Sequence, residues 1–152
     1  GNLESGLDHL VHSFILYSAQ QSPYRSDAAG KIGYIYNDLK SKNQTEIFDR
    51  LEQKTAQLHQ GLEEVAKSKG IPFQINRMGS MISLHFTEQA VVDFKTAALG
   101  NNERFKKYFH GMLNEGIYLP PSAFESYFLN DALTPENIEV TINNFNKVIL
   151  KI

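Results

Sequence analysis

The stretch from Gly116 to Glu125, which reads Gly-Ile-Tyr-Leu-Pro-Pro-Ser-Ala-Phe-Glu, constrains the fold more than any other part of the sequence. A preceding helix ends at the glycine, and a short strand from Ile117 must end at the two prolines, because neither can donate a ladder hydrogen bond. One carboxylate, Glu125, then follows among aromatic residues. Two interpretations are open: a pocket wall that carries an acid, or a surface turn with a solvated glutamate. The residue types alone favour the surface turn.

Composition and charge exclude several classes of protein. The 152 residues suffice for one domain with a core, and a net charge of -2 with a pI of about 6.2 gives no basic footprint for nucleic acid. No apolar run approaches the ~20 residues that span a bilayer, and the start lacks the basic region of a signal peptide. The absence of cysteine excludes disulfides, thiolate catalysis and cysteine-based zinc sites. We therefore expect a cytoplasmic protein that binds neither nucleic acid nor a membrane.

Apolar residues at spacings of three and four predict helices in the first half of the chain. The first two helices are expected over residues 3–20 and 27–42, and the apolar stripe of the first needs a partner. A third helix is predicted to start at a capping box formed by Asn43 and Glu46. It is expected to end at Gly70, a residue type that readily adopts the left-handed conformation.

Two further helices are predicted in the second half. One runs from Asn101 or the next residue to Asn114, and we interpret its aromatic stripe as core rather than as a platform for stacked bases. The last helix is expected to start at a Thr134 cap, with Pro135 in its first position. Residues 87–100 fit either a strand or the start of a helix.

Short strands are predicted between these helices. Ile82, Leu84 and Phe86 alternate with polar positions and therefore share one face, which helices could cover. Residues 76–79 are interpreted as a turn or bulge. The predicted strands are residues 73–75, 80–86, 117–119 and 127–129. The pattern predicts an α+β fold, in which helices cover a small, mostly antiparallel sheet. One further helix is expected at the N-terminus.

The histidines offer only weak candidate sites. His9 and His12 are three residues apart, a spacing that can seat a metal, but no third ligand is apparent. His85 or His110 could act with Glu125 in a hydrolase, although nothing in the sequence places these groups within hydrogen-bond reach. We interpret these side chains as ordinary helix and strand histidines.

Three motifs together resemble the C-terminal small domain of glutamate-1-semialdehyde aminomutase, a fold-type-I enzyme of the pyridoxal-phosphate-dependent aminotransferase superfamily. They are residues 76–81 (Asn-Arg-Met-Gly-Ser-Met), residues 116–125, and Asn137-Ile138 in the last helix. The similarity extends from about Ala28 to the C-terminus. It implies a small antiparallel sheet covered by helices, in agreement with the pattern of the residues.

The resemblance also implies a site residue and a missing part. Glu125, with Ser122 and Phe124, matches the family's Ser-x-Phe-Glu motif, whose acid faces the cofactor and substrate pocket. The family's large domain, with the Schiff-base lysine and the aspartate that pairs with the pyridine nitrogen, has no counterpart here. The Gly-Thr pair that the family uses to reach the phosphate of a neighbouring subunit's cofactor is also absent, and Leu133-Thr134 replaces a His-Thr pair.

Two hypotheses about function follow. In the first, residues 26–152 are the small domain of an aminomutase-like enzyme, inactive alone and binding no cofactor alone, whose parent reaction converts glutamate-1-semialdehyde to 5-aminolevulinate for tetrapyrrole synthesis. Its partner would be a missing large domain or a second copy in a homodimer. In the second, the chain is a non-catalytic binding or dimerisation module, because residues 1–25 do not resemble the family and carry their own apolar stripe.

Overall fold

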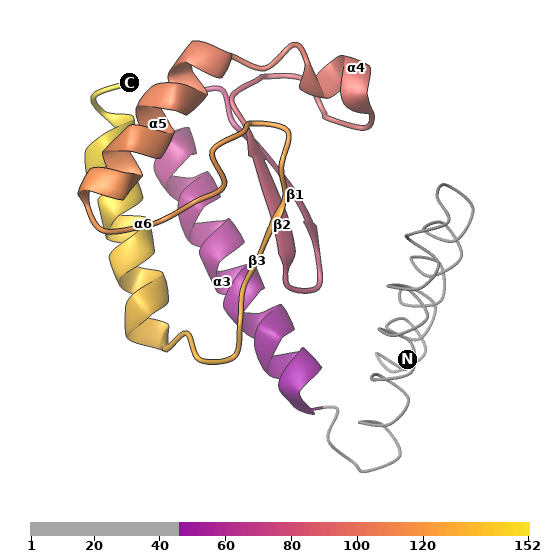
Figure 1. Ribbon diagram of the computed structural model, residues 1–152, viewed down its shortest axis with the longest axis vertical. Helices are drawn as coiled ribbons and strands as arrows, with labels where there is room; N and C mark the ends of the chain where they lie inside the picture. The colour runs from indigo at the N-terminus through magenta and orange to yellow at the C-terminus, as the bar shows by residue number, and fades with distance from the viewer. Residues whose placement is uncertain (1–45) are drawn as a thin grey trace. The chain divides into compact units, whose positions relative to one another are not determined.

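The computed structural model describes residues 46–152, and residues 47–152 form one compact unit (Figure 1). The predicted helices over 3–20 and 27–42, the Asn43 cap, the pair His9 and His12, and the boundary after residue 25 lie outside the described residues. In chain order the elements are α3 (Glu46–Ser68), β1 (Gln74–Met78), β2 (Met81–His85), α4 (Phe94–Ala97), α5 (Asn102–Asn114), β3 (Tyr127–Phe128) and α6 (Pro135–Ile149). The predicted α+β class is confirmed.

The sheet is antiparallel, with β2 between β1 and β3. The prediction of a turn at residues 76–79 is wrong, because β1 continues to Met78, which pairs with Met81 across the hairpin. Only Gly79 and Ser80 make the turn, and Gly79 takes a φ of 57° that favours glycine. Arg77 pairs with Ile82 in this ladder, and its guanidinium reaches across to Glu52 of α3.

The core lies between one face of the sheet and the long helices. Ile82, Leu84 and Phe86 are buried on the predicted face. Tyr108 of α5 and Phe145 of α6 meet edge to face in the centre of this core, with ring centroids 5.7 Å apart. Figure 1 shows α3 and α6 running beside each other, with α5 against α6. A large apolar area is thus removed from water within this unit.

The segment from Gly116 to Asn130 is mostly coil. The predicted strand over residues 117–119 does not form, because Gly116 has a φ of 83° and the Ile117 amide donates back to the Met112 carbonyl. These two features close the end of α5 and turn the chain away from the sheet. Of the strand predicted over residues 127–129, only Tyr127–Phe128 pairs with β2.

The loop of residues 86–101 is neither a strand nor a long helix. Its one helix is α4, four residues long, which begins at a capping box between Asp93 and Thr96. The side-chain amide of Asn76 donates to the Val91 carbonyl (2.8 Å), and the Asn101 amide donates to the Phe86 carbonyl (3.0 Å). The loop is therefore fastened at its start, its middle and its end.

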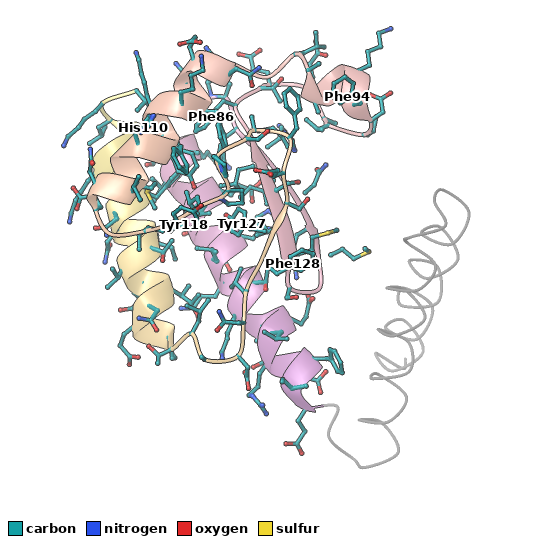
Figure 2. The ribbon with its side chains drawn as sticks, in the orientation of Figure 1. Phe86, Phe94, His110, Tyr118, Tyr127 and Phe128 are labelled. Carbon is teal, nitrogen blue, oxygen red and sulfur yellow. The ribbon has the colours of Figure 1, made fainter. Side chains whose placement is uncertain are left out.

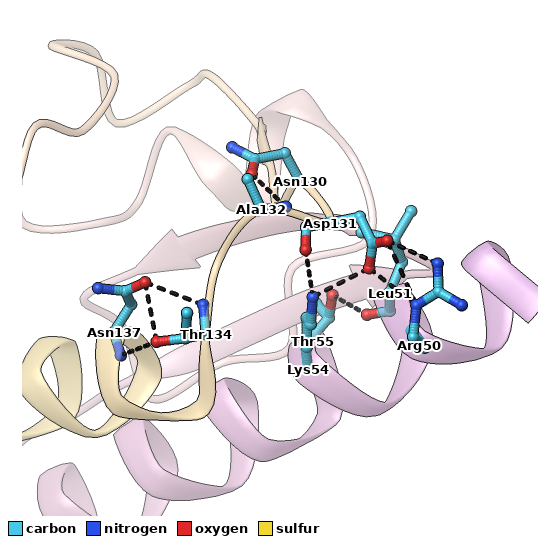
Figure 3. Close-up of polar contacts among 9 residues, drawn as sticks. All are labelled: Arg50, Leu51, Lys54, Thr55, Asn130, Asp131, Ala132, Thr134 and Asn137. Atoms are coloured by element: carbon cyan, nitrogen blue, oxygen red, sulfur yellow. Dashed lines mark hydrogen bonds and ion pairs between the residues drawn. The ribbon is translucent and has the colours of Figure 1, made fainter.

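The helix boundaries follow the sequence signals closely. Gly70 takes a φ of 63° after α3, as predicted for a helix-ending glycine. Thr134 caps α6 through a capping box with Asn137, and Pro135 occupies the start of the helix (Figure 3). These cap predictions are confirmed.

The end of the coil is held to α3 by Asp131 (Figure 3). Arg50 donates to both oxygens of the Asp131 carboxylate, with a closest approach of 2.6 Å from Nη2 to Oδ2. Lys54 Nζ lies 2.9 Å from Oδ1 and also donates to the Asp131 carbonyl. These contacts fix the exit of the coil just before α6 begins.

Candidate functional site

Glu125 closes a tight turn that follows the two prolines. The Ser122 amide donates to Glu125 Oε2 (3.1 Å), and the Glu125 amide donates back to the Ser122 carbonyl (3.2 Å). The hydroxyl of Ser122 also accepts from the Phe124 amide (3.2 Å). The Ser-Ala-Phe-Glu sequence therefore holds its own acid in place through local hydrogen bonds, a typical use of serine and carboxylate side chains in turns.

A small hollow of about 10 Å³ lies under this turn. It is lined by Leu84, Phe105, Tyr108, Leu119, Pro120, Ser122, Glu125 and Tyr127. A volume of this size holds about one water molecule. Glu125 is exposed on the surface of the turn and is also one of the residues that line this hollow.

Two tyrosines form the inner part of the hollow. Tyr108 comes from α5 and is 2% exposed, and Tyr127 comes from β3. Burial raises the pKa of both phenols, so both remain protonated at neutral pH. The sequence placed Tyr108 in an aromatic core stripe, and its role beside Glu125 was missed because residues 108 and 125 are distant in the chain.

Two aromatic residues project beside this turn rather than into it. Phe124 is 47% exposed and its ring lies 5.4 Å from that of Phe94, which is 73% exposed. Figure 2 shows Phe94 on α4, at the edge of the unit, and Tyr127 near the middle of the unit. The carboxylate therefore stands next to an exposed apolar surface.

The structure does not bring the histidines to Glu125. Neither His85 nor His110 lines the hollow. His85 ends β2 and is buried, which lowers its pKa, whereas His110 is exposed on α5. The hydrolase alternative therefore finds no support in the described residues, where neither histidine shares the hollow with Glu125.

The described part of the chain has neither a cluster of metal ligands nor a membrane-spanning helix. No group of three histidine, cysteine, aspartate or glutamate residues in 46–152 could hold a metal ion. No helix in that range is long and apolar enough to cross a membrane.

The residues around Glu125 do not fit a complete pyridoxal phosphate site. The hollow is too small for a pyridine ring, and no lysine or arginine lines it to bind an aldehyde or a phosphate. Lys54, the least exposed lysine among the ion pairs of residues 46–152, is engaged with Asp131 instead. The described residues could therefore supply one side of such a site, but not the whole.

The sequence of this chain is similar to that of known enzymes. No protein-family model matches the chain. Glutamate-1-semialdehyde 2,1-aminomutase of Flavobacterium johnsoniae is 57% identical over 106 residues, which are 70% of this chain and 25% of that enzyme. The chain belongs to the glutamate-1-semialdehyde aminomutase family. The aminomutase of Thermus thermophilus is 48% identical over 99 residues, or 65% of this chain and 23% of that protein. The chain thus spans about a quarter of the length of these aminomutases.

Solved structures agree on the fold. A glutamate-1-semialdehyde aminomutase from Pseudomonas aeruginosa superimposes with a TM-score of 0.62 at 18% identity, covering 70% of this chain and 23% of that one. An ω-transaminase from Sphaerobacter thermophilus gives a TM-score of 0.57 at 21% identity, covering 69% and 24%. Two of these neighbours were solved with a ligand: a variant of the Pseudomonas aeruginosa aminomutase in complex with PMP, and a transaminase with PLP bound. The predicted fold, a small antiparallel sheet with helices as in the fold-type-I aminotransferases, is confirmed.

Proposed function

We propose that this chain acts as the C-terminal small domain of a glutamate-1-semialdehyde aminomutase and supplies one wall of its active site. The observation that carries the proposal is the 57% identity to the Flavobacterium johnsoniae enzyme. The conversion of glutamate-1-semialdehyde to 5-aminolevulinate, which feeds tetrapyrrole synthesis, would belong to the assembled enzyme. The chain alone is expected to be inactive, because the match takes up only 25% of that enzyme.

Glu125 is the residue of this chain that we propose for the active-site wall. Its turn is held by hydrogen bonds among Ser122, Phe124 and Glu125, the three residues that carry the resemblance to the family motif. A carboxylate held by a rigid turn can orient a polar substrate without first losing conformational freedom. The cofactor itself would be held mainly by the rest of the enzyme.

The assembly and its location are part of the same proposal. We place the family-like domain at residues 26–152, preceded by a separate N-terminal segment of residues 1–25. The partner is a large domain of the aminomutase type, and the assembled enzyme is proposed to be a homodimer. It would work in the cytoplasm.

A fusion tests the proposal directly. In it, residues 46–152 replace the matching C-terminal part of the Flavobacterium johnsoniae aminomutase. We expect this fusion to form 5-aminolevulinate. Glu125→Gln in the fusion should lower kcat/KM by about tenfold or more, the loss expected for one charge-assisted contact. Glu139→Gln, an exposed glutamate on α6, is the matched control and should leave turnover unchanged. An inactive but folded, pyridoxal-loaded fusion would contradict the proposal.

A cofactor titration tests the expectation for the chain alone. Pyridoxal phosphate is added to the purified 152-residue chain, the visible aldimine band is followed, and borohydride reduction traps any labelled lysine. We expect no band, or labelling scattered over many lysines. Stoichiometric labelling of a single lysine would mean that the chain has a cofactor site of its own.

A non-catalytic binding or dimerisation module is the second candidate. It is favoured by the extent of the match, which leaves about 30% of the chain without a counterpart, as the 70% coverage implies. Deletion of residues 1–25 is the test, with oligomeric state and thermal stability as the measurements. Unchanged values for both would remove the basis of this candidate.

A further inference from the structure

We propose that the hollow under the turn of Glu125 binds one water molecule, which links the Tyr108 hydroxyl to the Glu125 carboxylate. Tyr108 is then a positioning residue, because it acts on the acid through the water rather than on the substrate. The ligand is a single water, and its main partners are a phenol donor and a carboxylate acceptor. The water site stands on the geometry of this chain alone, and its part in turnover rests on the proposed function.

The Tyr108 hydroxyl lies deep in the unit and has no protein partner there. The residue is 2% exposed, and in the part of the chain that the structure describes its hydroxyl makes no hydrogen bond to another residue. Yet no fully enclosed side-chain oxygen or nitrogen in residues 46–152 lacks a hydrogen-bond partner. The hydroxyl therefore keeps a small surface that water can reach, and the hollow is the space that the Tyr108 side chain lines. Buried polar groups without a protein partner are commonly satisfied by ordered water.

The hollow has the size and the lining of a water site. Its volume of about 10 Å³ is that of a single water. Besides Tyr108, its polar lining residues are Ser122, Glu125 and Tyr127, and the remaining lining residues are apolar. A buried water needs about two to four polar partners, which this lining can supply. An anion does not fit, because no lysine or arginine lines the hollow and a carboxylate does.

The chemistry of the two side chains fixes the direction of the hydrogen bonds. Burial raises the pKa of the Tyr108 phenol, with a smaller contribution from Tyr127, so the hydroxyl stays protonated and can donate to the water. A carboxylate only accepts, so the water donates to Glu125. The half-buried Tyr127 adds a second protonated phenol to the lining of the same hollow. The water therefore has both donors and an acceptor around it.

The water supplies a contact that the turn itself lacks. Glu125 Oε2 accepts from the Ser122 amide at 3.1 Å, whereas no protein group in the described residues donates to Oε1. A carboxylate held at one oxygen can still rotate, because the terminal torsion of a glutamate side chain has a broad energy profile. A water that holds Oε1 fixes the plane of the carboxylate. A fixed plane favours the orientation of a substrate that the acid contacts.

Crystal structures of the 152-residue chain and of two variants test the water site without relying on activity. In the unmodified chain we expect one ordered water at about 2.6–3.2 Å from both the Tyr108 hydroxyl and the Glu125 carboxylate. Tyr108→Phe keeps the ring and should lose the water, and Glu125 should then take more than one side-chain orientation. Tyr118→Phe is the matched control and should keep the water, because Tyr118 is 77% exposed and does not line the hollow. No ordered water in the unmodified chain, or a water that Tyr108→Phe leaves in place, would overturn the proposal.

A double-mutant cycle in the fusion described above tests the positioning role. Tyr108→Phe should lower kcat/KM by about two- to tenfold, the effect of losing one neutral hydrogen bond. In a fusion that already carries Glu125→Ala, the same change should have no further effect, because Tyr108 acts only through that carboxylate. A purely structural role of Tyr108 would lower kcat/KM by the same factor in both backgrounds, and that result would overturn the proposal.

The water site and the proposed function fail in different ways. A folded, pyridoxal-loaded fusion without turnover would overturn the proposed function, and the crystal structures would still decide the water site. An active fusion, together with a crystal structure that shows no water between Tyr108 and Glu125, would keep the function and overturn the water site. If Tyr108→Phe does not fold, the unmodified chain still decides, because its hollow either holds a water between the two side chains or does not.

Discussion

The interface between α5 and α6 and the edge that carries Phe94 and Phe124 use aromatic pairs in opposite ways. At the first, Tyr108 and Phe145 meet at 84° and are only 2% and 0% exposed. At the second, Phe94 and Phe124 lie at a similar separation but remain largely in water. Both pairs have favourable aromatic geometry, so ring contact alone does not distinguish them.

The difference between the two regions lies in what surrounds each pair. The rings of the α5–α6 interface are enclosed by other core residues, so their apolar area is already removed from water. Phe94 and Phe124 are positioned by polar anchors, the capping box of α4 and the turn of Glu125, which hold the rings without covering them. The first region therefore stabilises the unit, whereas the second buries too little apolar area to add much to its stability.

Phe145→Ala should produce the largest effect and test the first half of this comparison. Phe145 is fully buried and also contacts Phe73, at a centroid distance of 5.3 Å. Removing its ring leaves a cavity, and we expect a loss of about 3–5 kcal/mol in the free energy of unfolding. Urea denaturation of the 152-residue chain measures it.

Phe94→Ala is the matched control for that experiment. It removes the same side chain from the exposed pair, so the free energy of unfolding should change by no more than about 0.5 kcal/mol. Equal losses at the two positions would mean that the exposed pair belongs to the core of this unit, and the comparison would be wrong.

Elements with strong local signals could be predicted from the sequence. Thr134 and Pro135 are residue types that favour the start of a helix. The alternation of Ile82, Leu84 and Phe86 identifies the buried face of β2. The turn at residues 76–79 was placed incorrectly because pairing with β2 extends β1 to Met78, past Asn76, a residue type that favours turns. Local propensity carries no information about such pairing.

The candidate site was predictable only in part for the same reason. Glu125 is identified by its motif, and its hydrogen bonds are local. Tyr108 joins the hollow through packing of α5 on β2, and Phe94 meets Phe124 across thirty positions of the sequence, as the numbering shows. Periodicity assigns residues to a face of a helix, but it does not say which residues of another element they meet.

Gly111→Ala should have an intermediate effect and tests how closely α5 and α6 must approach. A Cβ atom at Gly111 would lie 2.5 Å from Cγ1 of Val148, a buried β-branched side chain whose rotamer a helix restricts. The clash should outweigh the better helix propensity of alanine. We expect a net loss of about 1–3 kcal/mol in the free energy of unfolding, measured by urea denaturation.

Gly61→Ala supplies the comparison, because a Cβ atom there would lie 2.3 Å from Cδ1 and 2.8 Å from Cγ1 of Ile142, which is also β-branched and lies on α6. Ile142 is only half-buried, whereas Val148 is buried, so its side chain has more room to shift. A smaller loss than at Gly111 is therefore expected. A larger loss of unfolding free energy at Gly61 would mean that the tightest helix packing lies between α3 and α6 rather than between α5 and α6.

Asp131→Asn should have the smallest effect and should depend on pH. The hydrogen bonds from Arg50 and then Lys54 hold the pKa of the Asp131 carboxyl well below its usual range. The folded state therefore releases this proton more readily than the unfolded state. The resulting stabilisation is complete above the unfolded pKa of about 3.9 and is lost as the pH falls towards the folded pKa. The unfolding temperatures of wild type and variant should differ near neutral pH and converge in acid.

The Asp131→Asn variant also tests whether the ion pairs at the end of the coil stabilise the unit through charge. If the ion pairs of Asp131 stabilise the unit, added salt should reduce the difference between wild type and variant at neutral pH, because charges near the surface are screened. Glu139→Gln removes an acid from the exposed face of α6, for which no ion pair is described in residues 46–152, and should show neither dependence. A difference that persists unchanged from neutral pH into acid would assign the effect of Asp131 to the geometry of its turn rather than to its charge.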